Sequence, residues 1–266
     1  MFQIIRNWLN HRIIRRSTIT QTEWGSAFSS LPLLSGYTVD EKQALRKLTI
    51  LFLDRKVFEG ANGLVVTQAM KLIIALQACI PILKLDLDDY NGWVSVIVYP
   101  AGFAPERVVM DEYGVQHRVQ SNLSGEAWQR GPVVLSWNDT EHAGIIDGHN
   151  LVIHEFSHKL DMQTGDANCF PPLHADMSSK KWFKYFSEGF KDFEYKCSRG
   201  KHIGIDCYAA TSPAEYFAVL SEVFFERPDV INQHYPNVYE QLRQYYKQDP
   251  LTRLNLAISP YTVTSY

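Results

Sequence analysis

The chain has 266 residues, a formal net charge of −3, and 45% hydrophobic and 13% aromatic residues. This composition is ample for a globular core, and it provides no overall positive field of the kind that holds nucleic acid non-specifically. We therefore expect a globular protein that does not bind nucleic acid directly.

The N-terminal segment 1–17 has apolar residues at helical spacing, interrupted by polar residues such as Arg6. It lacks the continuous apolar stretch of a signal peptide. We expect an amphipathic helix, and two interpretations stay open: it packs against the body of the domain, or it lies on a membrane surface. The longest apolar run, 72–83, is interrupted by Pro81 and is too short for a membrane span.

The first ninety residues are predicted to be helical. Segment 40–60 begins with acidic residues and ends at Gly60, and segment 67–81 begins at Thr67, a good N-cap residue, and stops at a proline. Both segments have broad apolar faces, so we expect two helices packed into the core.

From Trp93 onward the hydrophobic pattern changes to a period of two. Segments 93–100, 107–119 and 133–137 alternate or are rich in β-branched residues, and Tyr113-Gly114 fits a hairpin turn. We therefore expect a small antiparallel sheet.

The second half of the chain is predicted to return to helices. Asn150 is a candidate N-cap for a helix over 151–161, and further helices are expected at 212–226 and around 237–248. The aromatic-rich segment between them, about 162–206, shows no clear assignment.

The four cysteines contain no C-x-x-C pair; they are Cys79, Cys169, Cys197 and Cys207. This spacing suits neither a disulfide framework nor a cysteine zinc site. We expect four reduced thiols, as in a cytoplasmic protein.

The segment LVIHEFSHKLD, residues 151–161, carries the pattern H-E-x-x-H. His154 and His158 are four residues apart, so on a helix both imidazoles can bind one metal ion. Glu155 lies about 100° around the helix from His154, where it fits a general base acting on water. So short a pattern also occurs by chance, but burying these groups in an apolar helix would cost several kcal/mol unless they were paired or metal-bound. The pattern predicts one Zn²⁺ per chain.

A catalytic zinc normally takes a third protein ligand. The positions three and six residues beyond His158 are Asp161 and Thr164, which excludes the pattern with a third histidine there. A carboxylate from a later helix is the natural candidate.

Two glutamates of the segment 207–226 qualify. Glu215 and Glu222 are seven residues apart and lie on nearly the same helical face. Glu215 also fits a capping box with Ser212, a role that needs no metal, so the residues alone leave the choice open.

The motifs HEFSH and YAATSPAEYFAVLSE resemble the Mlc titration factor A family, bacterial cytoplasmic zinc metallopeptidases with an active site similar to that of anthrax lethal factor. The likeness extends over most of the chain. It implies that Glu215 is the third zinc ligand and that Tyr208 stabilises the oxyanion, for which a phenol is chemically suited. It also implies an interaction with the transcriptional repressor Mlc, and so an effect on glucose phosphotransferase genes.

The role of His117 stays open between a core residue and a metal ligand. It shares a strand face with Val115 and Val119, so it points inward if they do. The resemblance suggests that an upstream histidine approaches the zinc in a resting, self-blocked state. His142 and His149 are expected to face solvent. The other histidines show no ligand spacing; they are His11, His174, His202 and His234.

These features predict an α+β fold, a zincin-like metallopeptidase core with a small antiparallel sheet and an active-site helix, flanked by N- and C-terminal helices. A single domain, 1–266, would comprise a helical part, 1–90, and a zincin-like, gluzincin-like catalytic part, 91–266.

The expected function is zinc-dependent hydrolysis of peptide bonds, with aminopeptidase and endopeptidase action both open. Strand 133–137 is expected to pair with an extended peptide substrate, and Asp161 and Glu222 to orient the zinc-binding histidines. Two alternatives remain: a repressor-sequestering protein whose zinc is mainly structural, and a zinc hydrolase of a non-peptide substrate, which a pocket in place of an open groove would favour.

Overall fold

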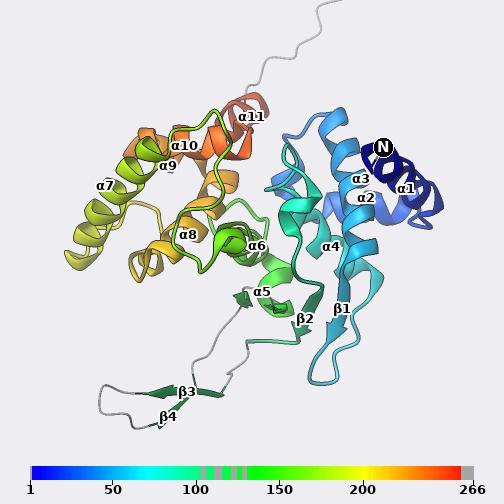
Figure 1. The fold of residues 1–266 in the computed structure, drawn as a ribbon, viewed down its shortest axis with the longest axis horizontal. Helices are drawn as coiled ribbons and strands as arrows, with labels where there is room; N and C mark the ends of the chain where they lie inside the picture. The colour runs from blue at the N-terminus through cyan, green and yellow to red at the C-terminus, as the bar shows by residue number, and fades with distance from the viewer. Residues whose placement is uncertain (1, 103–105, 111–115, 121–124, 128–130, 259–266) are drawn as a thin grey trace, which may run out of the picture.

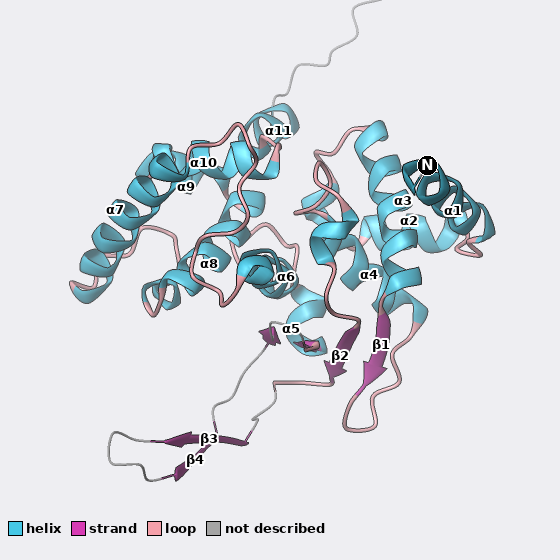
Figure 2. Ribbon diagram, viewed as in Figure 1, coloured by secondary structure: helices cyan, strands magenta, loops and turns pink. Residues whose placement is uncertain are grey.

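The fold is given by a computed structural model, which describes residues 2–102, 106–110, 116–120, 125–127 and 131–258. Helices dominate it, and the short strands lie in the lower part of the view in Figure 2. The α-helices are α1 (Phe2–Arg16), α2 (Gln21–Ser29), α3 (Val39–Arg55), α4 (Gln68–Cys79), α5 (Trp137–His142), α6 (Leu151–Asp161), α7 (Ser179–Ser198), α8 (Pro213–Glu226), α9 (Pro228–His234), α10 (Pro236–Tyr246) and α11 (Pro250–Ile258). Figure 1 shows α6 between the N-terminal helices on one side and α7 to α11 on the other.

Short 3₁₀ turns and six strands complete the described elements. The turns are η1 (Pro32–Leu34), η2 (Leu87–Tyr90), η3 (Met162–Thr164) and η4 (Cys207–Ala210). The strands are β1 (Val57–Gly60), β2 (Ser95–Tyr99), β3 (Glu106–Met110), β4 (Gln116–Gln120), β5 (Gly125–Ala127) and β6 (Val133–Ser136).

The main sheet has the strand order β1-β2-β6-β5. β1 pairs with β2 and β2 pairs with β6 in parallel, and only β5 runs antiparallel to its neighbour β6. The expected small antiparallel sheet is therefore wrong for this sheet. Alternation of apolar residues shows which face of a strand is buried but not its direction, and the chain between β1 and β2, which contains α4 and η2, is long enough for a parallel crossover.

Among the described strands, the antiparallel expectation also holds for a separate pair outside the main sheet. β3 and β4 pair antiparallel, with Val109 opposite His117. The expected turn residues of this hairpin, Tyr113 and Gly114, lie outside the described residues.

Two expected segments have different secondary structure. The single helix predicted for 40–60 is shorter, because α3 ends at Arg55 and the chain continues into β1, which pairs with the sheet. The unassigned segment 162–206 contains the 20-residue helix α7. Its buried residues Trp182, Phe186 and Phe193 recur at helical spacing, a signal present in the sequence.

An aromatic cluster fixes α6 against the N-terminal part of the chain. The ring of Phe156 on α6 lies 5.2 Å from the ring of Tyr90 and 5.6 Å from those of Phe52 and Trp93, measured between centroids. All four side chains are buried, and such ring pairs stabilise by about 0.5–1.5 kcal/mol beyond their burial. This contact holds one face of α6 so that the opposite face is presented to α8.

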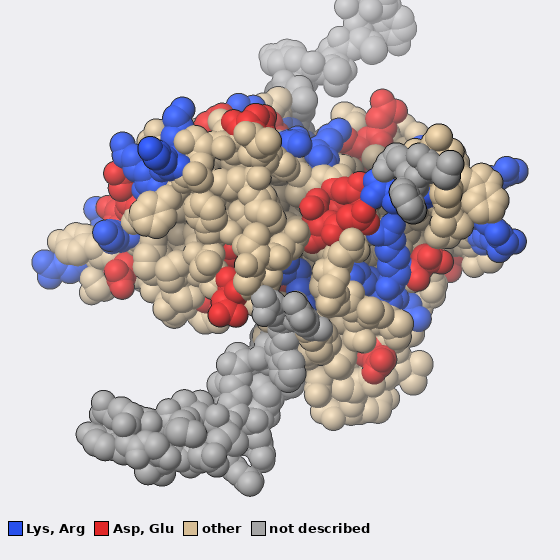
Figure 3. All heavy atoms as spheres, in the orientation of Figure 1, with Lys and Arg blue, Asp and Glu red and all other residues tan. Residues whose placement is uncertain are grey.

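The N-terminal helix α1 packs against the body through the partly buried residues Ile13 and Ile14, while Ile4 and Trp8 are exposed. Within the described part of the chain, no helix is both long enough and apolar enough to cross a bilayer. On the face shown in Figure 3, basic and acidic side chains are interspersed.

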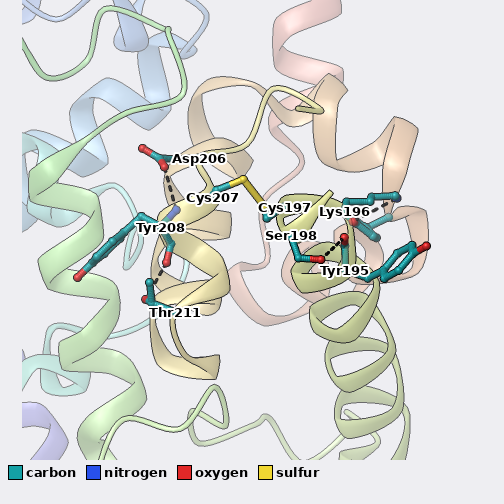
Figure 4. Close-up of a disulfide and its surroundings, with 9 residues drawn as sticks. Tyr195, Lys196, Cys197, Ser198, Asp206, Cys207, Tyr208 and Thr211 are labelled. Atoms are coloured by element: carbon teal, nitrogen blue, oxygen red, sulfur yellow. Dashed lines mark hydrogen bonds between the residues drawn. A yellow bond between two sulfur atoms is a disulfide. The ribbon is translucent and has the colours of Figure 1, made fainter. Parts of the chain in front are cut away.

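The expectation of four reduced thiols is wrong for two cysteines. Cys197, in the last turn of α7, and Cys207, in η4, form a disulfide with their Cα atoms 5.7 Å apart (Figure 4). Cys79 and Cys169 are free and buried. Disulfide pairing depends on the distance between two cysteines in the folded chain, which the spacing in the sequence does not reveal.

Candidate metal centre

The helix that carries H-E-x-x-H begins at a fully buried N-cap residue. The side chain of Asn150 accepts a hydrogen bond from the Ile153 backbone N–H at 3.0 Å, and its amide donates to Gln77 at 2.8 Å and to Glu226 at 2.9 Å. Gln77 belongs to α4 and Glu226 to α8. The start of α6 is thus fixed to both neighbouring helices, so its side chains have a defined position relative to α8.

Two imidazoles and one carboxylate converge between α6 and α8. Glu215 Oε2 lies 3.0 Å from His154 Nε2 and 3.3 Å from His158 Nε2, and the two Nε2 atoms are 3.2 Å apart. Glu215 Oε2 is buried and makes no hydrogen bond within the described part of the chain. Two imidazole nitrogens and one carboxylate oxygen thus lie within 3.3 Å of one another, so the site fits a divalent cation with two nitrogen ligands and one oxygen ligand, a set that suits zinc.

The geometry separates the two glutamates that the sequence left open. Ser212 does cap α8 by accepting a hydrogen bond from the Glu215 backbone N–H at 3.2 Å, but the Glu215 carboxylate faces the histidines. Glu222 lies on the other side of His154, with its Oε1 2.7 Å from His154 Nδ1. Its Oε2 also accepts the backbone N–H of Asn150. Glu222 therefore orients the His154 ring with Nε2 toward the centre.

Asp161 does not occupy the expected place beside a histidine. Its carboxylate accepts the backbone N–H groups of Asn168, Cys169 and Phe170 at 2.7–2.8 Å, and so closes the loop after α6. His158 Nδ1 is buried and has no hydrogen-bond partner among the residues that the structure describes.

Glu155 lies next to the two histidines and is 4% exposed. Its Oε2 makes no hydrogen bond to a described residue, and the side chain lines a pocket of about 580 Å³. Burial raises the pKa of the Glu155 carboxyl to about 7, and a cation at the centre would lower it again. A carboxylate in this position can exchange a proton with a molecule in the pocket.

Strand β5 lies directly against Glu155, and glycine makes this approach possible. A Cβ atom at Gly125 would collide with the carboxylate of Glu155 and would lie 2.7 Å from the Leu151 side chain. The sequence analysis did not find this residue, because three-residue β5 carries no recognisable hydrophobic pattern.

Tyr208 lines the same pocket from the turn η4. Its ring centroid is 6.2 Å from that of His154, and the side chain is 48% exposed. His142 and His149 are exposed, as expected, and also line the pocket. Further lining residues that the sequence analysis missed are Asp139, Asp147 and Asp206. The closeness of 138–149 to the motif helix in the sequence could have indicated Asp139 and Asp147, and the position of Asp206 two residues before Tyr208 could have indicated Asp206.

Two further expectations concern strands. β6 is paired with β2 on one edge and β5 on the other, so the expected pairing of 133–137 with a substrate is wrong. The backbone of His117 lies in β4, but its side chain is outside the described residues, and its approach to a metal stays a prediction.

Comparison with known proteins agrees with this arrangement of residues. The family model of glucose-regulated metallo-peptidase M90 matches residues 5–247. Curated relatives named Mlc titration factor A are similar to this chain over most of its length. They include proteins from Cronobacter sakazakii (36% identity over 89% of this chain and 90% of the relative), Escherichia coli (35%, 90% and 90%) and Yersinia pestis (36%, 87% and 86%). The chain therefore belongs to the glucose-regulated metallo-peptidase M90 family, relatives of Mlc titration factor A.

Proposed function

We propose that this protein is a zinc-dependent peptidase with His154, His158 and Glu215 as metal ligands and Glu155 as the general base. One observation carries the proposal: the two Nε2 atoms and the Glu215 oxygen converge on one point, and beside them in the pocket lies Glu155, whose Oε2 makes no hydrogen bond to a described residue. Two imidazoles and one carboxylate leave the fourth position of a zinc ion open, as catalytic zinc sites require.

Zinc bound at these ligands would polarise a peptide carbonyl and lower the pKa of a water molecule. Glu155 takes the proton of the attacking water through Oε2 and later passes a proton to the leaving amine. Tyr208, whose ring lies 6.2 Å from that of His154, donates a hydrogen bond to the oxyanion that develops on the carbonyl. Glu222 holds His154 Nδ1 throughout, so that Nε2 keeps its direction.

The substrate of this proposed reaction is a peptide. Among the described strands β5 ends the sheet order, so the edge that faces away from β6 is open to an added strand. A peptide paired there would lie over Glu155, held mainly by main-chain hydrogen bonds with little sequence preference. We propose that the protein acts in the cytoplasm, as the resemblance implies.

The decisive experiment replaces Glu155 with glutamine and measures both peptide hydrolysis and zinc content. Glu155→Gln keeps the shape of the side chain but removes the base, so hydrolysis of a fluorogenic peptide should fall by about 10²–10⁴-fold while one zinc per chain is retained. Glu194→Gln, on the exposed surface of α7, is the matched control and should keep full activity. Full hydrolysis by Glu155→Gln with zinc still bound would exclude Glu155 as the base.

A second function is favoured by the name that the similar proteins share. The relatives that this chain matches over about 90% of their length are called Mlc titration factor A. We therefore propose that this chain also binds a repressor of the Mlc kind. Capture of purified repressor should persist in Glu155→Gln, because binding and hydrolysis are separable. Absence of capture by the unmodified protein at micromolar concentrations would refute the proposal.

A further inference from the structure

The disulfide lies directly beside the proposed oxyanion residue. Cys207 is bonded to Cys197, and the next residue in the chain is Tyr208, which lines the pocket with His154 and Glu155. In Figure 4 the Tyr208 side chain points away from the disulfide and toward α6. The disulfide therefore holds the first residue of η4, Cys207, and the second residue, Tyr208, reaches the metal centre.

Packing against α7 and α8 and a few local hydrogen bonds also position this turn. η4 is a single 3₁₀ turn, capped by Asp206, whose side chain accepts the Tyr208 backbone N–H at 2.9 Å. Thr211 holds the other end by donating to the Tyr208 carbonyl at 2.7 Å. Ala209 is fully buried, whereas most of the preceding loop, 198–206, is exposed. Without the disulfide, the two ends of that loop would no longer be covalently linked, and one of these ends lies just before Tyr208.

The disulfide is also accessible, unlike the other two cysteines. Cys197 and Cys207 are each half-buried and have exposed neighbours in the chain, whereas Cys79 and Cys169 are buried. Access is a requirement for thiol–disulfide exchange, so a reagent in solution would act on this pair and not on the free thiols.

We propose that Cys197–Cys207 is a thiol–disulfide modification site that positions Tyr208: the oxidised form holds the tyrosine at the metal centre, and the reduced form releases it. In the reducing direction a dithiol breaks the S–S bond and becomes a disulfide itself, while Cys197 and Cys207 gain two electrons and two protons as thiols. The metal ligands lie on α6 and α8 and not on η4 itself, which packs against α8, and we expect them to stay in place. In a reducing compartment such an accessible disulfide would form and break reversibly and would not be a permanent structural cross-link.

This inference rests on the proposed peptidase activity, so its test includes a readout that does not. The unmodified protein is equilibrated with reduced or oxidised dithiothreitol, and the state of each cysteine is verified by alkylation and mass spectrometry. Hydrolysis of a peptide reporter should fall at least fivefold on reduction, mainly in kcat, with zinc content unchanged. The double variant C197S/C207S should show the lower rate under both conditions.

The variant Tyr208→Phe distinguishes positioning of the tyrosine from general damage. If the disulfide acts through Tyr208, reduction should change the rate of Tyr208→Phe by less than twofold. An equal loss in Tyr208→Phe and in the unmodified protein would overturn the proposal, as would an unchanged rate in fully reduced protein.

Limited trypsin digestion gives the activity-independent readout. Cleavage at Lys201, in the loop before Cys207, should become at least fivefold faster on reduction, whereas cleavage at Lys181, in the first turn of α7, should not change. If neither redox form hydrolyses peptides but Lys201 becomes labile on reduction, the peptidase proposal fails while the disulfide still controls this segment. Equal cleavage of both forms at Lys201 would refute control of the segment by the disulfide.

Discussion

The two walls of the candidate metal centre are built differently. The ligand wall consists of two helices, where His154 and His158 are buried and His154 is held from behind by Glu222. The second wall presents a half-exposed Tyr208 on a single 3₁₀ turn whose covalent anchor is the disulfide. Metal binding is thus built into the core, whereas the group proposed to stabilise the transition state sits on a short turn with a half-exposed side chain.

Removing a ligand should produce the largest effect and tests the ligand wall. His154→Ala should lose both the metal, from one ion per chain to near zero, and all peptide hydrolysis, because Glu215 and His158 alone leave too few ligands for tight binding. Elemental analysis of the purified protein provides the measurement. His149→Ala is the control, since His149 lines the same pocket but lies outside the cluster, and it should keep its metal. Full metal content in His154→Ala, with metal lost in His149→Ala, would refute His154 as a ligand.

A substitution in the second wall, at Tyr208, should lower the rate of peptide hydrolysis without changing the zinc content. Tyr208→Phe removes the proposed donor to the oxyanion, so kcat should fall by about 10²–10³-fold. Because the side chain is 48% exposed, the midpoint of thermal unfolding should shift by less than about 2 °C. A loss of zinc in this variant would show that the two walls are not independent.

Strand β5 connects to the ligand wall through Gly125. Gly125→Ala adds a methyl group that collides with the Glu155 carboxylate, so the base is displaced and kcat should fall by up to about 10²-fold with zinc retained. Gly25→Ala is a matched control, because a methyl group at Gly25 of α2 meets no atom within 4 Å. Wild-type rates for Gly125→Ala would mean that β5 does not constrain the base.

The hydrogen-bond network of Asn150, Glu222 and Glu226 at the start of α6 should give the smallest effect, a change in stability with pH. Burial, with a further contribution from Asp147 and Glu222, raises the pKa of Glu226 from 4.5 to about 7. Between these values the folded protein binds more protons than the unfolded chain, so the free energy of unfolding should decrease as pH rises from about 4.5 to 7. The decrease is at most about 3 kcal/mol, and Glu226→Gln should reduce it in urea unfolding curves recorded across this range. An unchanged pH dependence in the variant would assign the titration to another group.

Local features of the fold were predictable where neighbouring residues decide them. The N-cap residues Thr67, Asn150 and Ser212 begin α4, α6 and α8 as expected, because capping depends on residues within one turn. The direction of the strands and the role of β6 were not predictable in this way. They depend on which strand lies beside which, and β6 became a central strand because β5, a segment without a clear pattern, covers its edge.

The relative placement of His154, Glu155 and His158 follows from the motif, because positions one and four residues apart have a set relation on any helix. The packing of α6 against α8 was needed to show that Glu215, and not Glu222, faces both Nε2 atoms, and the folded chain was needed to show that Cys207 reaches Cys197. The physical reason is range: helical periodicity is a property of the local backbone, whereas the distance between two helices depends on how the whole core packs around them.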